Sequence, residues 1–489
     1  MCGIAGTLSF DSARFAVSER ALIAMRDRMA HRGPDGAGIW MSHDAQVGFA
    51  HRRLSVIDLA PAASQPMLSS DGTLVIVFNG EIYNHSELRR ELQALGQRGW
   101  QTDHSDTEVL LHAFHEWGIV CIHRFRGMFA FALWDRTRKA LWLVRDRIGI
   151  KPLYYARDSN GLTFASEIKA LLTDPLRRRE VNEEALFHYL SFLTTPSPQT
   201  LFAGINKLPA GGLLRASADG TVVERQWWDV LDASSPISVT NESEIPERVI
   251  SELRTAVALH KVADVPVGVF LSGGIDSSTN LVLFSEGEAD QVRAFSIAYA
   301  QDQSSVADEM PFARIMAAKT GAAHFEYTLT QDDLLDFLPR MIDLQDEPIA
   351  DPVCVPVHFV SRLARQNGVV VAQVGEGADE LFCGYPYWKA VIALESANSL
   401  PVPRFLKRAA HATLSCAGLG EYSKTELLRR AAEGQPLFWG GAEAFTQAGK
   451  QKLLSSRLRQ KFAGCTSWDA IGAIRHRFDE KAWDRSPLA

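Results

Sequence analysis

The apolar segments of this chain change character near residue 250, and that change limits the folds the chain can adopt. Before it, short apolar runs are separated by Gly and Asn turns and helical stretches are few, which indicates an α+β half with stacked sheets. After it, apolar runs of buried-strand type alternate with helical stretches, which predicts βαβ units around a parallel sheet. From about Lys389 onward the chain is rich in Ala, Leu and Arg and is expected to be helical.

Individual elements follow from the same patterns. Residues 74–78 predict a strand that ends in a turn at Asn79-Gly80. Apolar runs over 128–134 and 140–144 flank a polar turn and predict a hairpin. Helices are expected over 18–29 and 106–116, and buried strands over 265–271, 292–299 and 369–374.

The segment between the two halves suggests where one domain ends. It contains Pro209-Ala210-Gly211-Gly212 and then a largely polar run over 232–244. We therefore expect a first domain over residues 1–210, a final hairpin and linker over 211–245, and a second domain over 246–489.

Composition excludes several classes of protein. The net charge of −7 argues against a nucleic-acid-binding protein, which needs a basic surface. Six cysteines are scattered without a CxxC pair, which fits a reducing compartment and offers no zinc-site spacing. The start of the chain lacks the pattern of a signal peptide, and no run of about 18 apolar residues could span a membrane. We expect a cytoplasmic protein.

Cys2 follows Met1 directly, in the run Met1-Cys2-Gly3-Ile4-Ala5-Gly6. Removal of Met1 would leave a thiol and a free α-amine on one residue, and the amine could take the proton of the thiol. An N-terminal amine has an ordinary pKa of about 8, so much of it can be neutral near neutral pH. By itself, a cysteine at this position is equally compatible with no special role.

Four further motifs follow in the first half, over residues 31–35, 51–56, 78–84 and 104–108. In the third of these, the amide of Asn79 and the backbone N–H of Gly80 can point at one oxygen, as an oxyanion hole requires. Singly, each motif has a structural explanation, because Asn-Gly is usually a turn and an acid at a helix start is usually a cap. Their joint occurrence after Cys2 favours a catalytic site.

These motifs resemble those of the class II glutamine amidotransferase domain, which has the N-terminal-nucleophile fold of stacked sheets with helices. The resemblance implies that Cys2 is the nucleophile that forms a glutamyl thioester, with Asn79 and Gly80 as the oxyanion hole. It also implies that glutamine is bound by Arg53, Leu54, Val56, Asn79, Glu81 and Asp106. The chemistry agrees, because Arg binds a carboxylate bidentately while Glu and Asp suit an ammonium group.

In the second half, the run 271–278 follows a predicted strand and opens a helix, so its N–H groups can bind an anion. It lacks the Gly-Lys-Ser/Thr of the common phosphate loop, and Asp276 is placed to hold Mg²⁺. A plain strand-to-helix turn is the structural alternative. The run 374–380, also acidic and glycine-rich, follows another strand, so both loops are expected at the carboxyl edge of the sheet.

Together the two loops resemble the pyrophosphate loop of ATP pyrophosphatases and the synthetase domain of glutamine-hydrolysing asparagine synthetases. The resemblance implies an α/β parallel-sheet domain, with Asp276 and Asp379 as Mg²⁺ ligands and Glu376 as a catalytic residue of the ammonia step. It implies that ATP is bound by Leu271, Ser272, Gly273, Gly274, Asp276, Ser277, Ile297, Val374 and Gly375. The run 346–352 lies either near the substrate or in a loop that caps the sheet.

The implied activity is amidation of a carboxylate with ammonia from glutamine, through an acyl-adenylate, with ATP and Mg²⁺. Aspartate is the expected acceptor, and a sugar acid of cell-surface polysaccharide synthesis is an alternative. The Asp-Lys pair, the Glu-x-Arg-x-Pro-Phe-Leu-Asp run and the late lysine that members usually show after the second loop are absent from the sequence. We therefore also consider a C-terminally truncated pseudoenzyme with glutaminase activity alone. A homodimer is a further expectation.

Overall fold

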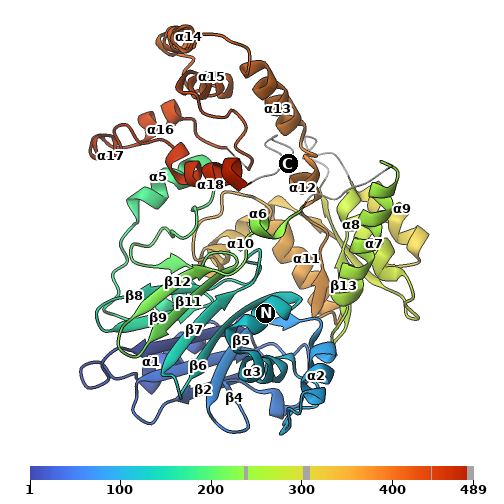
Figure 1. Ribbon diagram of the computed structural model, residues 1–489. Coiled ribbons are helices and arrows are strands. Elements are labelled where there is room, and N and C mark those ends of the chain that lie inside the picture. Colours follow the sequence, from blue (N-terminus) through green and yellow to red (C-terminus); the bar gives the residue numbers. More distant parts are fainter. Residues whose placement is uncertain (236–240, 301–308, 442, 482–489) are drawn as a thin grey trace.

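A computed structural model describes residues 1–235, 241–300, 309–441 and 443–481 (Figure 1). Two six-stranded sheets are stacked in the N-terminal half, which we define as β1 to α6, and a four-stranded sheet lies in the C-terminal half, from α7 onward. Among the described helices, none is long and apolar enough to cross a membrane.

The first sheet has the order β10-β8-β9-β1-β3-β2, and the second has the order β12-β11-β7-β6-β5-β4. The pairings that join their strands are antiparallel. The strands are β1 (Gly3–Ser9), β2 (Gly36–Met41), β3 (Val47–Arg53), β4 (Met67–Leu68), β5 (Leu74–Ile82), β6 (Gly127–Asp135), β7 (Ala140–Arg145), β8 (Tyr154–Arg157), β9 (Gly161–Ala165), β10 (Asn206–Lys207), β11 (Gly212–Ser217) and β12 (Val222–Gln226).

Apolar side chains from facing strands form the core between the two sheets. Ile4 and Leu8 of β1 pack in one buried cluster with Val75 and Val77 of β5. Alternate residues Ile76 and Phe78 instead face helices on the other side of the second sheet, as the two-residue period of a strand requires.

Helices cover the outer faces of both sheets, so this half has four layers. Helix α1 packs on the first sheet, while α2 and α3 pack on the second. The helices of this half are α1 (Glu19–Arg28), η1 (Pro61–Ala63), α2 (His85–Ala94), α3 (Asp106–Trp117), η2 (Gly118–Arg124), α4 (Ile168–Leu171), α5 (Glu183–Phe192) and α6 (Val230–Ala233). The predicted helices over 18–29 and 106–116 are confirmed by α1 and α3.

One predicted turn is wrong. Strand β5 continues through Asn79 and Gly80 to Ile82, paired with β6 along its whole length. A Cβ on Gly80 would lie 2.3 Å from the carbonyl oxygen of Met128, so this glycine permits a close approach of β6 rather than a turn. The predicted hairpin over 128–144 is confirmed by β6 and β7.

The hairpin of β11 and β12 belongs to the second sheet, because β11 pairs with β7 and β12 pairs with β11. It therefore adds two strands to the N-terminal half beyond the boundary expected at residue 210. We propose that the first domain includes this hairpin and ends near Gln226.

The C-terminal half contains the parallel sheet that the alternating pattern predicted, with the order β15-β14-β13-β16. Its strands are β13 (Val267–Phe270), β14 (Arg293–Tyr299), β15 (Ala323–Leu329) and β16 (Val371–Gln373). Strand β15 was not predicted. The surrounding helices are α7 (Glu244–Leu259), α8 (Ile275–Ser285), α9 (Met310–Thr320), α10 (Gln331–Leu344), α11 (Cys354–Gln366) and α12 (Ala378–Phe382).

The described residues from Pro386 to Lys481 are largely helical, as their composition predicted, and part of this segment docks on α5 of the N-terminal half (Figure 1). Phe187 of α5 packs with Leu454 and Phe462. The side chain of Lys450 donates to Ser467 at 2.7 Å, and Ser467 donates to Ser191 of α5 at 2.7 Å. These helices are α13 (Pro386–Asn398), α14 (Arg404–Cys416), α15 (Ser423–Glu433), α16 (Gln447–Leu453), α17 (Ser456–Lys461) and α18 (Trp468–Lys481).

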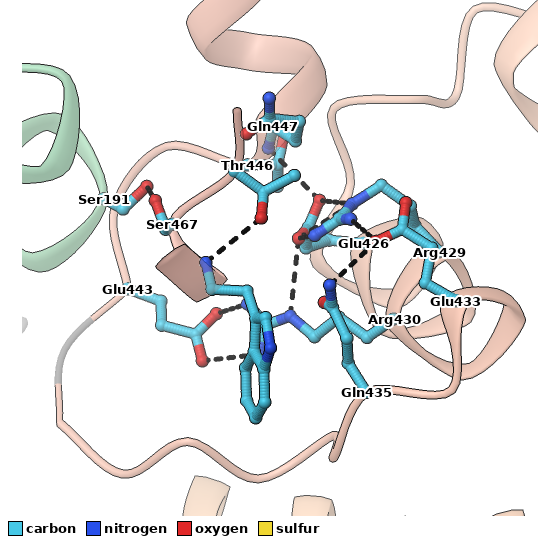
Figure 2. Close-up of polar contacts among 12 residues, drawn as sticks. Ser191, Glu426, Arg429, Arg430, Glu433, Gln435, Glu443, Thr446, Gln447 and Ser467 are labelled. Carbon is cyan, nitrogen blue, oxygen red and sulfur yellow. Dashed lines mark hydrogen bonds and ion pairs between the residues drawn. The ribbon is translucent and has the colours of Figure 1, made fainter. Parts of the chain in front are cut away.

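A buried ionic cluster holds these helices together, and Figure 2 shows the carboxylate of Glu426 between the side chains of Arg429 and Arg430. Arg429 binds Glu426 through two nitrogens, and the backbone N–H of Gln447 donates to the same carboxylate at 3.1 Å. Arg430 also pairs with Glu443. Since the side chains of Glu426, Arg429 and Arg430 are buried, each charge needs an oppositely charged partner to offset its lost hydration.

Candidate active site

One cavity of about 1420 Å³ lies between the two halves of the chain. Its wall includes the start of β1, the end of β5 and the N-terminus of α3 on one side, and α7, the N-terminus of α8 and the loop after β16 on the other. The residues of the two predicted sites that line it are Cys2, Arg53, Leu54, Val56, Asn79, Gly80, Glu81, Asp106, Asp276, Val374, Gly375 and Glu376. Every residue predicted to bind glutamine therefore lies in this wall.

The thiol of Cys2 lies just before the first residue of β1, against the backbone of Leu54. The N–H of Leu54 donates to Sγ at 3.4 Å, and Sγ donates to the carbonyl oxygen of Leu54 at 3.6 Å. Burial raises the pKa of the thiol, so it needs a base to ionise. Burial also lowers the pKa of the adjacent Met1 α-amine to about 6, which leaves an amine here able to accept a proton near neutral pH.

Asn79 is fully buried in β5, and neither polar atom of its side-chain amide makes a hydrogen bond within the described residues. Leaving a buried amide unpartnered is costly, so such a group in a cavity wall points to a ligand. An amide that faces the space beside Cys2 can donate to an oxyanion that forms there.

The guanidinium of Arg53, at the end of β3, is buried and held by backbone carbonyls. Its Nη1 donates to the oxygen of Ala60 at 3.1 Å, and its Nη2 donates to the oxygen of Asp58. Asp58 has a φ of 53°, so the turn that offers this carbonyl is in the left-handed region. The remaining N–H groups of Arg53 stay available for a carboxylate.

Two carboxylates, the half-buried one of Glu81 and the buried one of Asp106, share the same part of the cavity. Burial raises the pKa of Glu81 to about 7, and burial raises that of Asp106 to about 6. Asp106 begins α3, and its Oδ2 accepts from the N–H of Ile82 at 3.0 Å. An ammonium group placed beside these carboxylates would favour their ionised forms.

Sequence reasoning missed Lys151, which also lines this part of the cavity. Its side chain is buried, burial lowers the pKa of its ammonium group, and the charges of Glu81 and Cys2 act on it. Lys151 follows β7 in a loop with no motif of its own, so only the fold places it here. His51, in contrast, is a core histidine whose Nε2 contacts the carbonyl oxygen of Phe78 at 3.2 Å.

The two glycine-rich loops meet at the carboxyl edge of the parallel sheet, because β13 and β16 are neighbours. Oδ2 of Asp276, in the first turn of α8, accepts from the N–H of Ala378 at 3.1 Å. A Cβ on Gly375 would lie 2.6 Å from the carbonyl carbon of Asp276 and 2.8 Å from the nitrogen of Ser277. The loops therefore contact each other directly, and Gly375 makes that contact possible.

Hydrogen bonds within the first loop fix its shape. The hydroxyls of Ser272 and Ser277 are 3.0 Å apart, and the N–H of Gly274 donates to Ser272 at 3.2 Å. Gly273 has a φ of 93° and lies against the carbonyl of Glu309. Among the described residues, those of the nucleotide prediction that do not line the cavity are Leu271, Ser272, Gly273, Gly274, Ser277, Ile297 and Asp379.

The residues present fit Mg²⁺ only together with a substrate. Asp276 and Asp379 lie in the first turns of α8 and α12, which follow the two adjacent loops, and the charges of both act on Tyr385. Within the described ranges, no group of three or more His, Cys, Asp or Glu side chains could hold a metal ion by itself. Mg²⁺ is commonly bound by one or two carboxylates plus substrate phosphates and waters, which matches this donor set.

Comparison with known proteins identifies a family for each half of the chain. The family described as glutamine amidotransferase domain matches residues 1–228, and the family described as asparagine synthase matches residues 248–481. The chain is thus an enzyme of glutamine-dependent, ATP-driven amidation.

Comparison with individual relatives identifies the family of the whole chain. "Asparagine synthetase [glutamine-hydrolyzing] 1" of Bacillus subtilis is 35% identical over 455 residues, which cover 93% of this chain and 70% of that protein. "Asparagine synthetase [glutamine-hydrolyzing] 3" of the same organism is 34% identical over 79% of this chain and 64% of that protein. "Amidase chry2" of Gibberella zeae is 31% identical over 77% of this chain and 57% of that protein. The chain belongs to the family of glutamine-hydrolysing asparagine synthetases.

Proposed function

We propose that this enzyme hydrolyses glutamine at Cys2 and transfers the ammonia to the β-carboxylate of aspartate, with ATP and Mg²⁺ at the second site. The observation that carries the proposal is the shared cavity, which has Cys2 and the unpartnered amide of Asn79 in one part of its wall. Asp276, Gly375 and Glu376 lie in another part of the same wall.

The glutamine half of the reaction starts after Met1 is removed. The α-amine of Cys2 accepts the proton of Sγ, and the thiolate attacks the side-chain carbonyl of glutamine. Asn79 and the N–H of Gly80 donate to the oxyanion that forms. The C–N bond breaks, the amine returns its proton to the leaving nitrogen as ammonia, and water hydrolyses the thioester to glutamate.

Recognition of glutamine uses the charged groups around the thiol. Arg53 binds the α-carboxylate, because its guanidinium is fixed by two carbonyls and keeps further donors. Glu81 and Asp106 bind the α-ammonium group, which compensates for their burial. Leu54 and Val56 complete the wall of the site.

The cavity suits the passage of ammonia from one site to the other. Its wall includes apolar side chains of both halves, among them Ile57, Leu253, Ala256, Val257, Leu283 and Val371. An apolar wall favours neutral ammonia over ammonium, because a charged group loses more hydration on burial. Ammonia that stays neutral remains a nucleophile for the second reaction.

At the second site, the acceptor carboxylate attacks the α-phosphorus of ATP and displaces pyrophosphate. The first loop and the N-terminus of α8 bind the phosphates through N–H groups. Asp276 and Asp379 would hold Mg²⁺, which neutralises charge on the leaving pyrophosphate. Ammonia then attacks the acyl-adenylate, Glu376 accepts a proton from the attacking nitrogen, and the amide and AMP are released.

The test follows glutamate, pyrophosphate, AMP and asparagine together, with glutamine, aspartate, ATP and Mg²⁺ supplied. We expect the four products in equal amounts. Cys2→Ala should abolish glutamate release while synthesis from added ammonium salt continues. Replacing aspartate by uronic acids tests the acceptor, and amide formation with a uronic acid but not with aspartate would contradict the proposal.

A further inference from the structure

A continuous chain of polar contacts begins at the main chain of the nucleophile. Nε of Arg32 donates to the carbonyl oxygen of Cys2 at 2.9 Å. Nη1 of the same guanidinium donates to Oε1 of Glu167 at 3.0 Å, and Oε2 of Glu167 accepts from Nζ of Lys169 at 3.2 Å. Arg32 lies in one of the sequence motifs of the first half, whereas Glu167 and Lys169 lie in no predicted motif.

The chain continues into the C-terminal half through Asp346, which follows α10. Nζ of Lys169 lies 3.2 Å from Oδ1 of Asp346. The N–H groups of Ile168 and Lys169 also donate to this carboxylate, at 2.6 and 3.1 Å. Nζ of Lys169 donates to the carbonyl oxygen of Leu344 at 2.7 Å as well, so the lysine is held by two groups of the other half.

The chain is shielded from water along its length. The side chains of Arg32, Glu167, Lys169 and Asp346 are 9 to 11% exposed, and their charges alternate in sign. Although burial opposes it, the hydrogen bond from His31 and the charges of Arg32 and Lys169 hold the pKa of Glu167 at about 2. The members of such buried pairs depend on one another, because removal of one member leaves its partner as an uncompensated charge.

Cys2 depends on this support because it lies outside the sheet. The ladder of β1 with β3 begins at Gly3, which is opposite Arg52. The carbonyl of Cys2 thus precedes the first paired residue, and Arg32 supplies its hydrogen bond. The orientation of the Cys2 main chain decides where its α-amine and Sγ point relative to the substrate carbonyl.

We propose that Asp346, in the C-terminal half, is a positioning residue for Cys2 and acts through Lys169, Glu167 and Arg32. The inference rests on the proposed function, since it requires Cys2 to be the nucleophile. It gives a role to the acidic run 346–352 that the sequence left open between a substrate contact and a cap. The glutaminase site is thereby incomplete without a side chain of the synthetase half.

The neighbouring residue Glu347 provides a matched control. It also joins the halves, because it accepts from the N–H of Leu201 at 2.6 Å and from Thr195 at 3.3 Å. It pairs with Lys207 at 3.7 Å. In the part of the chain that the structure describes, these contacts lead to β10 and to the segment between α5 and β10, and not to Arg32 or Cys2.

The experiment compares Asp346→Asn with Glu347→Gln in the full chain. We expect Asp346→Asn to lower kcat for glutamine hydrolysis about tenfold or more, with KM for glutamine within about twofold, because misplacement acts on the chemical step. Synthesis from added ammonium salt should continue at the wild-type rate, and Glu347→Gln should leave kcat unchanged. A fall in ammonium-dependent synthesis equal to the fall in glutamine hydrolysis would assign Asp346 to the acceptor site and overturn the proposal.

Lys169 gives a second set of variants that does not depend on the folding of Asp346→Asn. Lys169→Met should reproduce the loss of kcat, Lys169→Arg should restore most of it, and Lys169→Met combined with Asp346→Asn should be no worse than the stronger single change. Additive losses would show that the two residues act separately.

The two proposals fail in different ways. Glutamate release that survives Cys2→Ala would remove the proposed function and this inference together. Release that requires Cys2 but does not respond to Asp346→Asn would overturn this inference alone.

Discussion

Nε2 of His104 lies 2.6 Å from Oδ2 of Asp264, across the boundary between the two halves. The same Oδ2 accepts from the N–H of Asp58 at 2.7 Å, and the carbonyl of Asp58 accepts from Arg53. His104 precedes Asp106 by two residues, so one carboxylate of the C-terminal half contacts the segments that carry Arg53 and Asp106, two of the three charged groups proposed for glutamine. Like Asp346, Asp264 ties the glutamine site to the other half.

This pair should make the stability of the enzyme depend on pH. Hydrogen bonds to Asp264 and then Asp103 raise the pKa of His104, with Asp58 also raising it. Since the folded pKa lies above the unfolded value of about 6.5, the stabilisation is complete below that value and is lost as the pH rises through the folded pKa. The melting temperature of wild type should exceed that of Asp264→Asn at pH 6 and approach it at pH 9.

Asp103→Asn is the control, because its carboxylate is exposed and contacts His104 at 2.9 Å without reaching Asp58. We expect this variant to have a smaller effect at pH 6 than Asp264→Asn. A difference between wild type and Asp264→Asn that stays constant from pH 6 to pH 9 would contradict the assignment.

Glutamine should bind more tightly as the pH rises from 6 to 8. Burial raises the pKa of Glu81 to about 7 and that of Asp106 to about 6, so acid removes the negative charges proposed for the ammonium group. If the ionised form of Glu81 is the one that binds, the Kd falls about tenfold over this range. Calorimetry on Cys2→Ala measures this without turnover, and Glu81→Gln should flatten the profile.

Arg53→Lys should raise KM for glutamine about tenfold while kcat changes less, because a lysine keeps the charge but loses the bidentate grip on a carboxylate. The structure adds a second reason. The guanidinium is oriented by the carbonyls of Asp58 and Ala60, and an ammonium group cannot contact both and still present a fork. Steady-state kinetics measure both constants, and an unchanged KM would show that Arg53 does not bind glutamine.

Much of the fold could be predicted because it depends on local patterns. The run 292–299 gave β14, and the runs 128–134 and 140–144 gave a paired hairpin, since apolar residues in short segments define buried strands. The Asn79-Gly80 pair led to a wrong prediction, because the sequence does not distinguish a glycine that lets two strands approach closely from a glycine in a turn. Strand β15 was missed because its sequence, Ala323 to Leu329, is interrupted by His, Glu and Thr.

Residues of the site could be predicted only where they belong to a sequence motif. Cys2, Asn79 and Asp106 belong to motifs, and the structure brings them to one cavity, while their roles stay predictions. Lys151 and Glu167 belong to no motif, and their places in the site depend on partners that are distant in the sequence. The bond from Arg32 to Glu167 spans 135 residues, and no local pattern records a contact of that kind.

The docking of the C-terminal helices should depend on Glu426. Glu426→Gln removes the buried carboxylate that Arg429 and Arg430 share and leaves them only the less buried Glu433 and Glu443, which should cost about 3 kcal/mol in the free energy of unfolding. Glu433→Gln is the control, because that carboxylate is 40% exposed and contacts Arg429 and Gln435 at the edge of the cluster, and it should cost less than about 1 kcal/mol. Urea unfolding followed by fluorescence compares the two, and equal losses would contradict the view that burial of the cluster matters.

The contact between the two glycine-rich loops should be needed for amidation but not for glutamine hydrolysis. In Gly375→Ala, the added Cβ would overlap the backbone of Asp276 and Ser277, which cannot yield as a flexible side chain would. The loops should separate, and the positions of the groups proposed for ATP and Mg²⁺ should change, which typically costs about tenfold or more in rate. We expect KM for ATP to rise and pyrophosphate release to fall, with glutamate release near the wild-type rate. Gly420→Ala is the control, since its Cβ would meet ordinary contacts at 3.5 Å, far from both loops in sequence. If Gly375→Ala formed asparagine at the wild-type rate, the contact between the loops would have no part in the second site.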